Sequence, residues 1–170
     1  MIQSEKVHLL TISSIFAAII FLFTAYFFHI PFATGYIHFG DTLVFLAAAL
    51  LPKPYAIGAA VVGMGLSDLM TAPIWVLPTV LIKTLVVLSF SSKTEKIVCS
   101  RNMIGVVCAY FVNVAGYFVF TGILYQDWLF PIVRLYTDLI PPFICGILFI
   151  AIGKVLDRTR LKEKFFTGRG

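Results

Sequence analysis

The sequence predicts an all-α membrane protein whose six transmembrane helices form a single bundle, with the N- and C-termini cytoplasmic. Residues 9–28 contain no Asp, Glu, Lys or Arg, and four more long apolar stretches follow. About 20 apolar residues in a helix span the roughly 30 Å hydrocarbon core of a bilayer. Hydrophobic residues make up 60% of the chain and charged residues 12%, whereas a soluble domain carries about 25% charged residues. The 170 residues are therefore expected to form one transmembrane domain of a multi-pass protein in the cell membrane.

The first predicted helix covers about residues 7–28 and ends before Pro31, which cannot continue a helix. Its apolar run is too long for the hydrophobic part of a signal peptide, and no small-residue cleavage site follows it, so we expect it to be retained. Residues 29–40 contain Pro31, Gly35 and Gly40 but no Lys or Arg. This segment is predicted to be a loop on the outer side of the membrane.

Prolines separate the next three predicted helices. The second covers about residues 41–51, and Asp41 is a suitable N-cap. At about 11 residues it crosses only part of the membrane, unless the loop before it also enters the membrane. Pro52 and Pro54 form a turn, the third helix covers about residues 55–70, and Pro73 begins the fourth at 73–90.

The last two predicted helices cover about residues 103–124 and 131–155, after a polar stretch at 91–102. Six spans place both termini on one side, and basic residues mark the cytoplasmic side of a membrane protein. That side carries eleven of the thirteen basic residues: Lys6, Lys53, Lys93, Lys96, Arg101, Lys154, Arg158, Arg160, Lys162, Lys164 and Arg169. Arg134 alone is on the other side, and Lys83 lies within the fourth helix. We expect Lys83 to extend toward the cytoplasmic edge rather than to contact a ligand.

Small residues recur at helical spacing on two of these helices. Ala59, Gly63 and Ser67 follow one another every fourth position on the third helix, which is typical of close helix packing in lipid. Ser14 and Ala18 have the same spacing on the first helix, and this face either packs within the bundle or docks a partner subunit. The three cysteines are far apart and are expected to be free thiols.

Polar and aromatic residues gather in the outer half of the predicted bundle, where they suit the binding of a flat, polar small molecule. The candidate substrate-binding residues are His38, Asp41, Asp68, Trp75, Asn113, Tyr117, Arg134, Tyr136 and Asp138. Several of them have a structural alternative. Asp41 could only cap its helix, Asn113 could only bond a neighbouring helix, and Arg134 and Asp138 could pair with each other. Trp75 could belong to the interfacial aromatic belt.

The sequence offers little for catalysis. It contains no GxSxG, HExxH or phosphate-binding loop motif, and we expect no enzyme activity, no cofactor and no metal site. A filter for ions and the inverted repeats of an autonomous transporter are also missing. One alternative remains, a small integral membrane enzyme that acts on a lipid or isoprenoid with His38, Asp41 or Asp68 as acid, base or metal ligand. Another is an assembly protein that only scaffolds other chains.

A resemblance to a known family favours transport. The segment Gly-Tyr-Ile-His-Phe-Gly-Asp-Thr at 35–42, the apolar run at 45–51 and the glycine-rich helix ending in Ser-Asp-Leu at 67–69 resemble the substrate-binding S components of energy-coupling factor (ECF) vitamin transporters. The six-span layout and the basic tail are similar too. The resemblance implies that the chain captures a vitamin or vitamin precursor from outside with high affinity.

The resemblance also implies partners. An S component associates with a transmembrane coupling protein and two ABC ATPases, which supply the energy for uptake. Ser14, Ala17 and Ala18 match the family's small-residue docking face, and residues 29–40 match its lid over the ligand. Few positive groups lie among the candidate residues, so we expect neither a folate nor a phosphate as ligand. We favour hydroxymethylpyrimidine or a pyridoxine-like ring.

Overall fold

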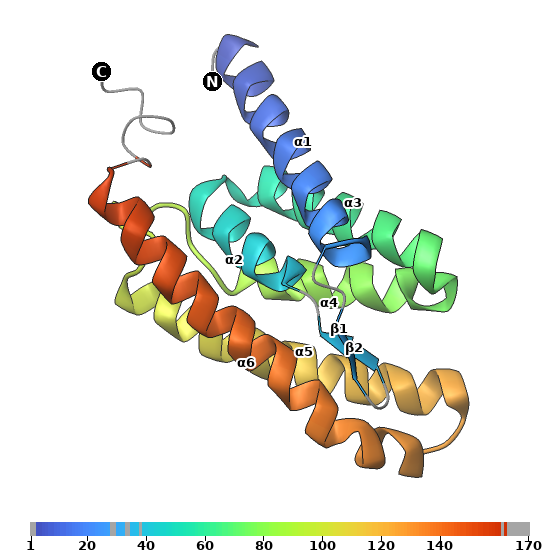
Figure 1. The fold of residues 1–170 in the computed structure, drawn as a ribbon. Coiled ribbons are helices and arrows are strands. Elements are labelled where there is room, and N and C mark those ends of the chain that lie inside the picture. Colours follow the sequence, from blue (N-terminus) through green and yellow to red (C-terminus); the bar gives the residue numbers. More distant parts are fainter. Residues whose placement is uncertain (1–2, 28–29, 33–34, 38, 161, 163–170) are drawn as a thin grey trace.

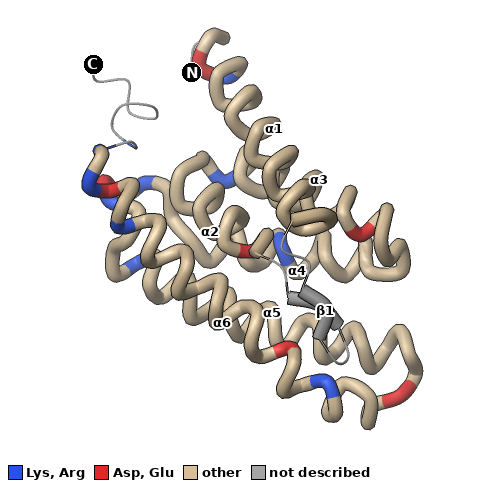
Figure 2. Tube along the Cα trace, viewed as in Figure 1, with Lys and Arg blue, Asp and Glu red and all other residues tan. Residues whose placement is uncertain are grey.

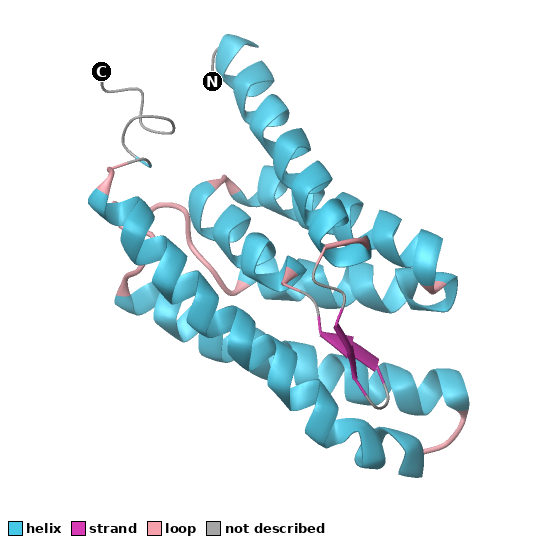
Figure 3. Ribbon diagram, in the orientation of Figure 1, coloured by secondary structure: helices cyan, strands magenta, loops and turns pink. Residues whose placement is uncertain are grey.

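The computed structural model describes residues 3–27, 30–32, 35–37, 39–160 and 162. Within these residues six α-helices form a bundle, and a short β-hairpin joins the first two of them (Figure 1; Figure 3). The elements in chain order are α1 (Gln3–Ala25), β1 (Ile30–Phe32), β2 (Gly35–Ile37), α2 (Gly40–Leu50), α3 (Lys53–Thr71), the single 3-10 turn η1 (Pro73–Trp75), α4 (Val76–Leu88), α5 (Ser100–Tyr125) and α6 (Leu129–Arg158).

The predicted all-α membrane bundle is confirmed, and the helix boundaries differ from the predicted ones by a few residues. Helices α1, α5 and α6 are long and apolar enough to cross a membrane, while α2 and residues 73–88 are shorter apolar helices. Helix α1 ends at Ala25 because the backbone N–H groups of Tyr26 and Phe27 both donate to the Leu22 carbonyl at 3.0 Å, which closes a turn. Pro73 opens a 3-10 turn before α4.

Helix α2 lies inside the bundle and forms much of its core. All of its residues except Leu43 are buried, as expected for a helix that is apolar on every side. The Phe45 ring lies 5.2 Å from the Phe90 ring and 6.2 Å from the Phe149 ring, so α2 is tied to the end of α4 and to α6. Its 11 residues extend about 16 Å, which is about half the thickness of the hydrocarbon core of a bilayer.

Helices α1 and α3 pack closely because Gly63 has no side chain. A Cβ atom at Gly63 would lie 2.7 Å from the Ala17 carbonyl oxygen and 2.8 Å from the Ile20 Cβ. The Ser13 hydroxyl donates to the Tyr55 carbonyl at 2.7 Å and joins the same two helices. The small-residue pattern on α3 therefore serves packing within the bundle.

Basic residues gather where α1 begins and α6 ends, at one end of the bundle (Figure 2). The Asp157 carboxylate accepts the backbone N–H groups of Ile97 and Val98 at 2.7 and 2.9 Å, which fixes the loop before α5 on α6. The Lys162 ammonium donates to the Ala49 carbonyl in the last turn of α2 and to the Thr94 carbonyl. Burial lowers the pKa of Lys162, but a cation is favourable at the C-terminus of a helix.

The hairpin that follows α1 is antiparallel, and Ile30 pairs with Ile37, Pro31 with Tyr36 and Phe32 with Gly35. The hairpin lies within residues 29–40, and the role of this segment as a lid over the ligand stays a prediction. His38 lies outside the described residues, so its predicted role in binding is also untested.

Candidate ligand-binding cavity

A cavity of about 250 Å³ opens between α1, α3, α4, α5 and α6, and the first turn of α2 contributes to its wall. It is lined by Thr24, Asp41, Met64, Asp68, Ala72, Trp75, Thr79, Lys83, Asn113, Tyr117, Arg134, Asp138, Pro141 and Pro142. Every α-helix of the bundle therefore supplies at least one lining residue. A small molecule in this cavity would contact the whole bundle at once.

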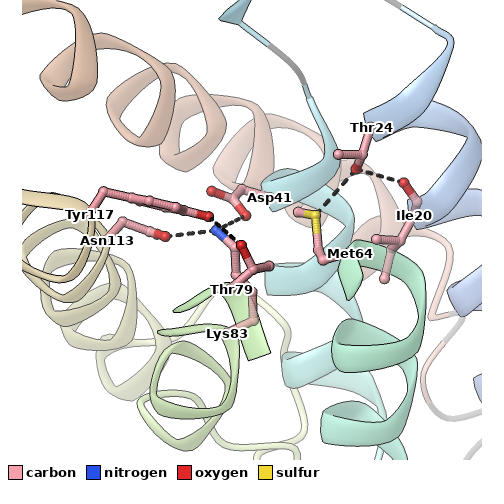
Figure 4. Close-up of polar contacts among 8 residues, drawn as sticks. All are labelled: Ile20, Thr24, Asp41, Met64, Thr79, Lys83, Asn113 and Tyr117. Atoms are coloured by element: carbon pink, nitrogen blue, oxygen red, sulfur yellow. Dashed lines mark hydrogen bonds and ion pairs between the residues drawn. The ribbon is translucent and has the colours of Figure 1, made fainter. Parts of the chain in front are cut away.

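Lys83 lies at the centre of the polar lining (Figure 4). Its ammonium is 2.7 Å from Asp41 Oδ1 and donates to Asn113 Oδ1 at 2.7 Å. It also lies 5.3 Å from the centre of the Tyr117 ring, a distance suited to a cation–π contact. The Lys83 side chain is 1% exposed, so the prediction that it extends to the cytoplasmic edge is wrong. The carboxylate of Asp41 holds it inside the bundle instead.

Aromatic rings form one wall of the cavity. The centres of the Trp75 and Tyr117 rings lie 5.7 Å apart, and their planes are inclined by 56°. The Tyr117 hydroxyl and the Thr79 hydroxyl are 3.3 Å apart and share a hydrogen bond. Met64 and Thr24 bound the cavity on the α1 side, where the Thr24 hydroxyl lies 3.3 Å from the Met64 sulfur. A flat ring could stack against this wall.

Apart from Asp41 Oδ1, which faces the Lys83 ammonium in the ion pair, three polar atoms of lining residues are buried without a hydrogen-bond partner in the described part of the chain: Asn113 Nδ2, Asp68 Oδ2 and Arg134 Nε. Buried polar groups in native proteins nearly always have a partner, because an unpaired one costs roughly 1–3 kcal/mol. Two of the three atoms are donors and one is an acceptor. All three therefore remain available for a further hydrogen bond.

Arg134 and Asp138 form an ion pair across one turn of α6, with 3.3 Å between Nη2 and Oδ1. The predicted pairing is present, and both residues also line the cavity. Among the described residues, the lining thus holds three carboxylates, those of Asp41, Asp68 and Asp138, against the two cations Lys83 and Arg134. An anionic ligand would add to this excess of negative charge.

The cavity brings together seven of the nine predicted binding residues: Asp41, Asp68, Trp75, Asn113, Tyr117, Arg134 and Asp138. Tyr136 does not line the cavity and is 54% exposed. Its position explains this, because residues four apart share a helix face whereas Tyr136 lies two positions from both Arg134 and Asp138. For Lys83 we preferred an extended side chain to a contact with a ligand, although it lines the cavity and an ionisable group inside a span is by default functional.

The three predicted docking residues on α1 do not share one exposed face. Ser14 and Ala18 are exposed, and the Ser14 hydroxyl donates to the Leu10 carbonyl within the same helix. Ala17 is turned toward α3, where its backbone approaches Gly63. The part of the proposed docking face that is open to a partner is therefore formed by Ser14 and Ala18.

The bundle and its cavity define a multi-pass membrane protein built to hold a small molecule. The chain belongs to the family described as ECF-type riboflavin transporter, S component, which matches residues 4–158 of it. It is thus a binding subunit for vitamin uptake in the cell membrane, and the resemblance seen in the sequence is confirmed. The family consists of transport subunits, and no observation favours an enzyme that acts on a lipid or isoprenoid. Comparison with curated proteins and with solved structures gave no match.

Proposed function

We propose that this chain binds a vitamin with a planar, nitrogen-containing aromatic ring in the cavity. A separate ECF module, formed by a coupling protein and two ABC ATPases, then drives uptake of the bound vitamin. The observation that carries the proposal is the combination of an aromatic wall, Trp75 and Tyr117, with three buried polar atoms that lack a partner in the described residues. Stacking would hold the faces of the ring, and the unpaired atoms would bond its edges.

The ligand class follows from chemistry that several vitamins share. Hydroxymethylpyrimidine and pyridoxine have one aromatic ring, whereas riboflavin, which the family's description names, has a fused tricyclic ring. The volume of about 250 Å³ is below the roughly 300–1,000 Å³ typical of drug-sized ligands and favours the smaller rings. All three are uncharged or weakly basic, which suits a lining with more carboxylates than cations.

A binding experiment with the purified protein tests this proposal. Riboflavin, hydroxymethylpyrimidine and pyridoxine are titrated separately, and binding is measured by calorimetry and by quenching of tryptophan fluorescence. We expect one of the three to bind and to quench, because Trp75 lines the cavity. Trp75→Phe should remove most of the quenching, whereas Trp128→Phe should retain it, since Trp128 packs on Gly122 outside the cavity. Absence of binding by all three would refute the proposed ligand class.

A phosphate group on the ligand should abolish tight binding. Flavin mononucleotide is the phosphorylated form of riboflavin, and pyridoxine phosphate is that of pyridoxine. We expect the phosphorylated member of each pair to bind at least about 100-fold more weakly, because its charge would enter a buried site that already has more carboxylates than cations. Equal affinity within a pair would show that the ring binds with its substituent outside the cavity.

The energy for uptake comes, in this proposal, from a transmembrane coupling protein and two ABC ATPases. Ala18→Trp is expected to abolish vitamin uptake in cells but to leave binding by the purified protein unchanged, because Ala18 is exposed on α1 and does not line the cavity. Ala115→Trp is the matched control, since Ala115 is an exposed alanine on α5. Normal uptake by the Ala18→Trp variant would exclude this part of α1 as the docking face.

A further inference from the structure

The buried Lys83 ammonium restricts how the Asn113 amide can lie. An ammonium has three N–H donors and no acceptor. The Lys83 Nζ atom lies 2.7 Å from Asp41 Oδ1, with which it forms the ion pair. It also donates a hydrogen bond to Asn113 Oδ1 at 2.7 Å. If the amide were turned over, its NH₂ group would face the ammonium, and two donors would oppose each other. Only the carbonyl oxygen of Asn113 can therefore face Lys83.

The consequence appears on the other side of the amide. With Oδ1 bonded to Lys83, the Nδ2 group of Asn113 is left, and it is buried without a partner in the described residues. Asn113 lines the cavity, so this group is a donor available to a ligand. Asp68 Oδ2, also buried and unpaired in the described residues, is an acceptor in the same cavity.

We propose that Lys83 is a positioning residue that makes Asn113 an obligate hydrogen-bond donor to the ligand, while Asp68 serves as the acceptor. The ligand is then a ring that offers an acceptor, such as a ring nitrogen or carbonyl oxygen, to Asn113 and an N–H or O–H group to Asp68. This inference rests on the proposed function and narrows its ligand class. Lys83 itself acts through Asn113 and needs no contact with the ligand.

Asn102 provides an internal control, because it and Asn113 are the two asparagines of the sequence. The Nδ2 group of Asn102 donates to the Ser91 and Ile97 carbonyls at 3.1 and 2.9 Å, and its Oδ1 accepts the Ser91 N–H at 2.8 Å. Its amide is thus fully bonded in the first turn of α5, about three turns before Asn113. An observable that reports the side-chain amides will thus show one responsive and one unresponsive asparagine.

The first test is Asn113→Asp, which separates a structural role from a binding role. The aspartate can still accept from Lys83, but it presents a second oxygen to the cavity where Asn113 presents a donor. We expect the purified variant to stay folded in detergent, because residue 113 still offers an acceptor to the Lys83 ammonium. Affinity for whichever of riboflavin, hydroxymethylpyrimidine and pyridoxine the wild type binds should fall roughly 10- to 100-fold. An unchanged affinity would overturn the proposal, because it would mean that Asn113 only supports Lys83.

The second test removes the constraint on the amide in the Asp41→Ala/Lys83→Met double variant. In protein with ¹⁵N-labelled asparagine and no ligand, we expect the side-chain amide signals of Asn113 to shift relative to the wild type and those of Asn102 to stay. Unshifted Asn113 signals would overturn the positioning role of Lys83. This readout needs no ligand, so failure of all three vitamins to bind would refute the proposed function without deciding this inference.

Discussion

Replacing Asp41 by Ala is expected to lower the free energy of unfolding by about 3–5 kcal/mol, which is the usual cost of removing one partner of a buried ion pair. The cost is high because Asp41 Oδ1 is the carboxylate atom 2.7 Å from the Lys83 ammonium, and both side chains are less than a tenth exposed. Without the carboxylate a cation would remain deep in a membrane protein. Thermal unfolding of the purified protein in detergent measures the effect.

The double variant Asp41→Ala/Lys83→Met separates the charge from the shape of the site. It removes both charges, and replacing a buried ion pair by apolar groups is often neutral for stability. We therefore expect it to unfold at nearly the wild-type temperature, although it should bind the vitamin more weakly. Glu95→Ala, at an exposed acidic residue, is the control and should leave stability unchanged. An Asp41→Ala variant as stable as the wild type would show that the pair does not hold the bundle together.

The layout of the helices could be predicted from the sequence because membrane thickness and proline chemistry leave few choices. Apolar runs of about 20 residues define spans, and prolines at 52, 54 and 73 fix the turns around the third helix. The position of α2 at the centre of the bundle could not be read in the same way. Its burial depends on which faces of the other helices pack around it, and the sequence of α2 does not identify those faces.

The site was predictable to the extent that residues share a helix face. Asn113 and Tyr117 are four apart, as are Arg134 and Asp138, and all four line the cavity. Tyr136 was included for its chemistry and its place in the outer half of the bundle, but it lies on another face of the helix. Lys83 was misjudged because a long side chain can reach the membrane edge when nothing holds it inside. Its partner Asp41 is on another helix, and only the tertiary structure brings the two charges together.

Gly63→Ala is expected to destabilise the protein by about 1–3 kcal/mol, the usual cost of forcing a group into a packed interior. The new Cβ would lie 2.7 Å from the Ala17 carbonyl oxygen, which is backbone and cannot rotate away, so α1 and α3 would have to separate. Helices in lipid associate through such close packing, because the lipid tails are as apolar as the side chains. Detergent unfolding of both proteins measures the difference.

Gly58→Ala is the matched control, because it lies on the same helix and a Cβ there would meet nothing nearer than the Ser13 hydroxyl oxygen, at 3.9 Å. Both changes gain the same helix propensity, up to about 1 kcal/mol, so their difference isolates the contact with α1. Moving α1 also moves Thr24, which lines the cavity beside Met64. Gly63→Ala should therefore weaken vitamin binding as well as stability, whereas Ala18→Trp on the outer side of α1 should not. Equal stability of the two glycine variants would contradict this prediction, because it would mean that α1 can move away from α3 at no cost in stability. The reason to expect weaker vitamin binding by Gly63→Ala would then also be gone.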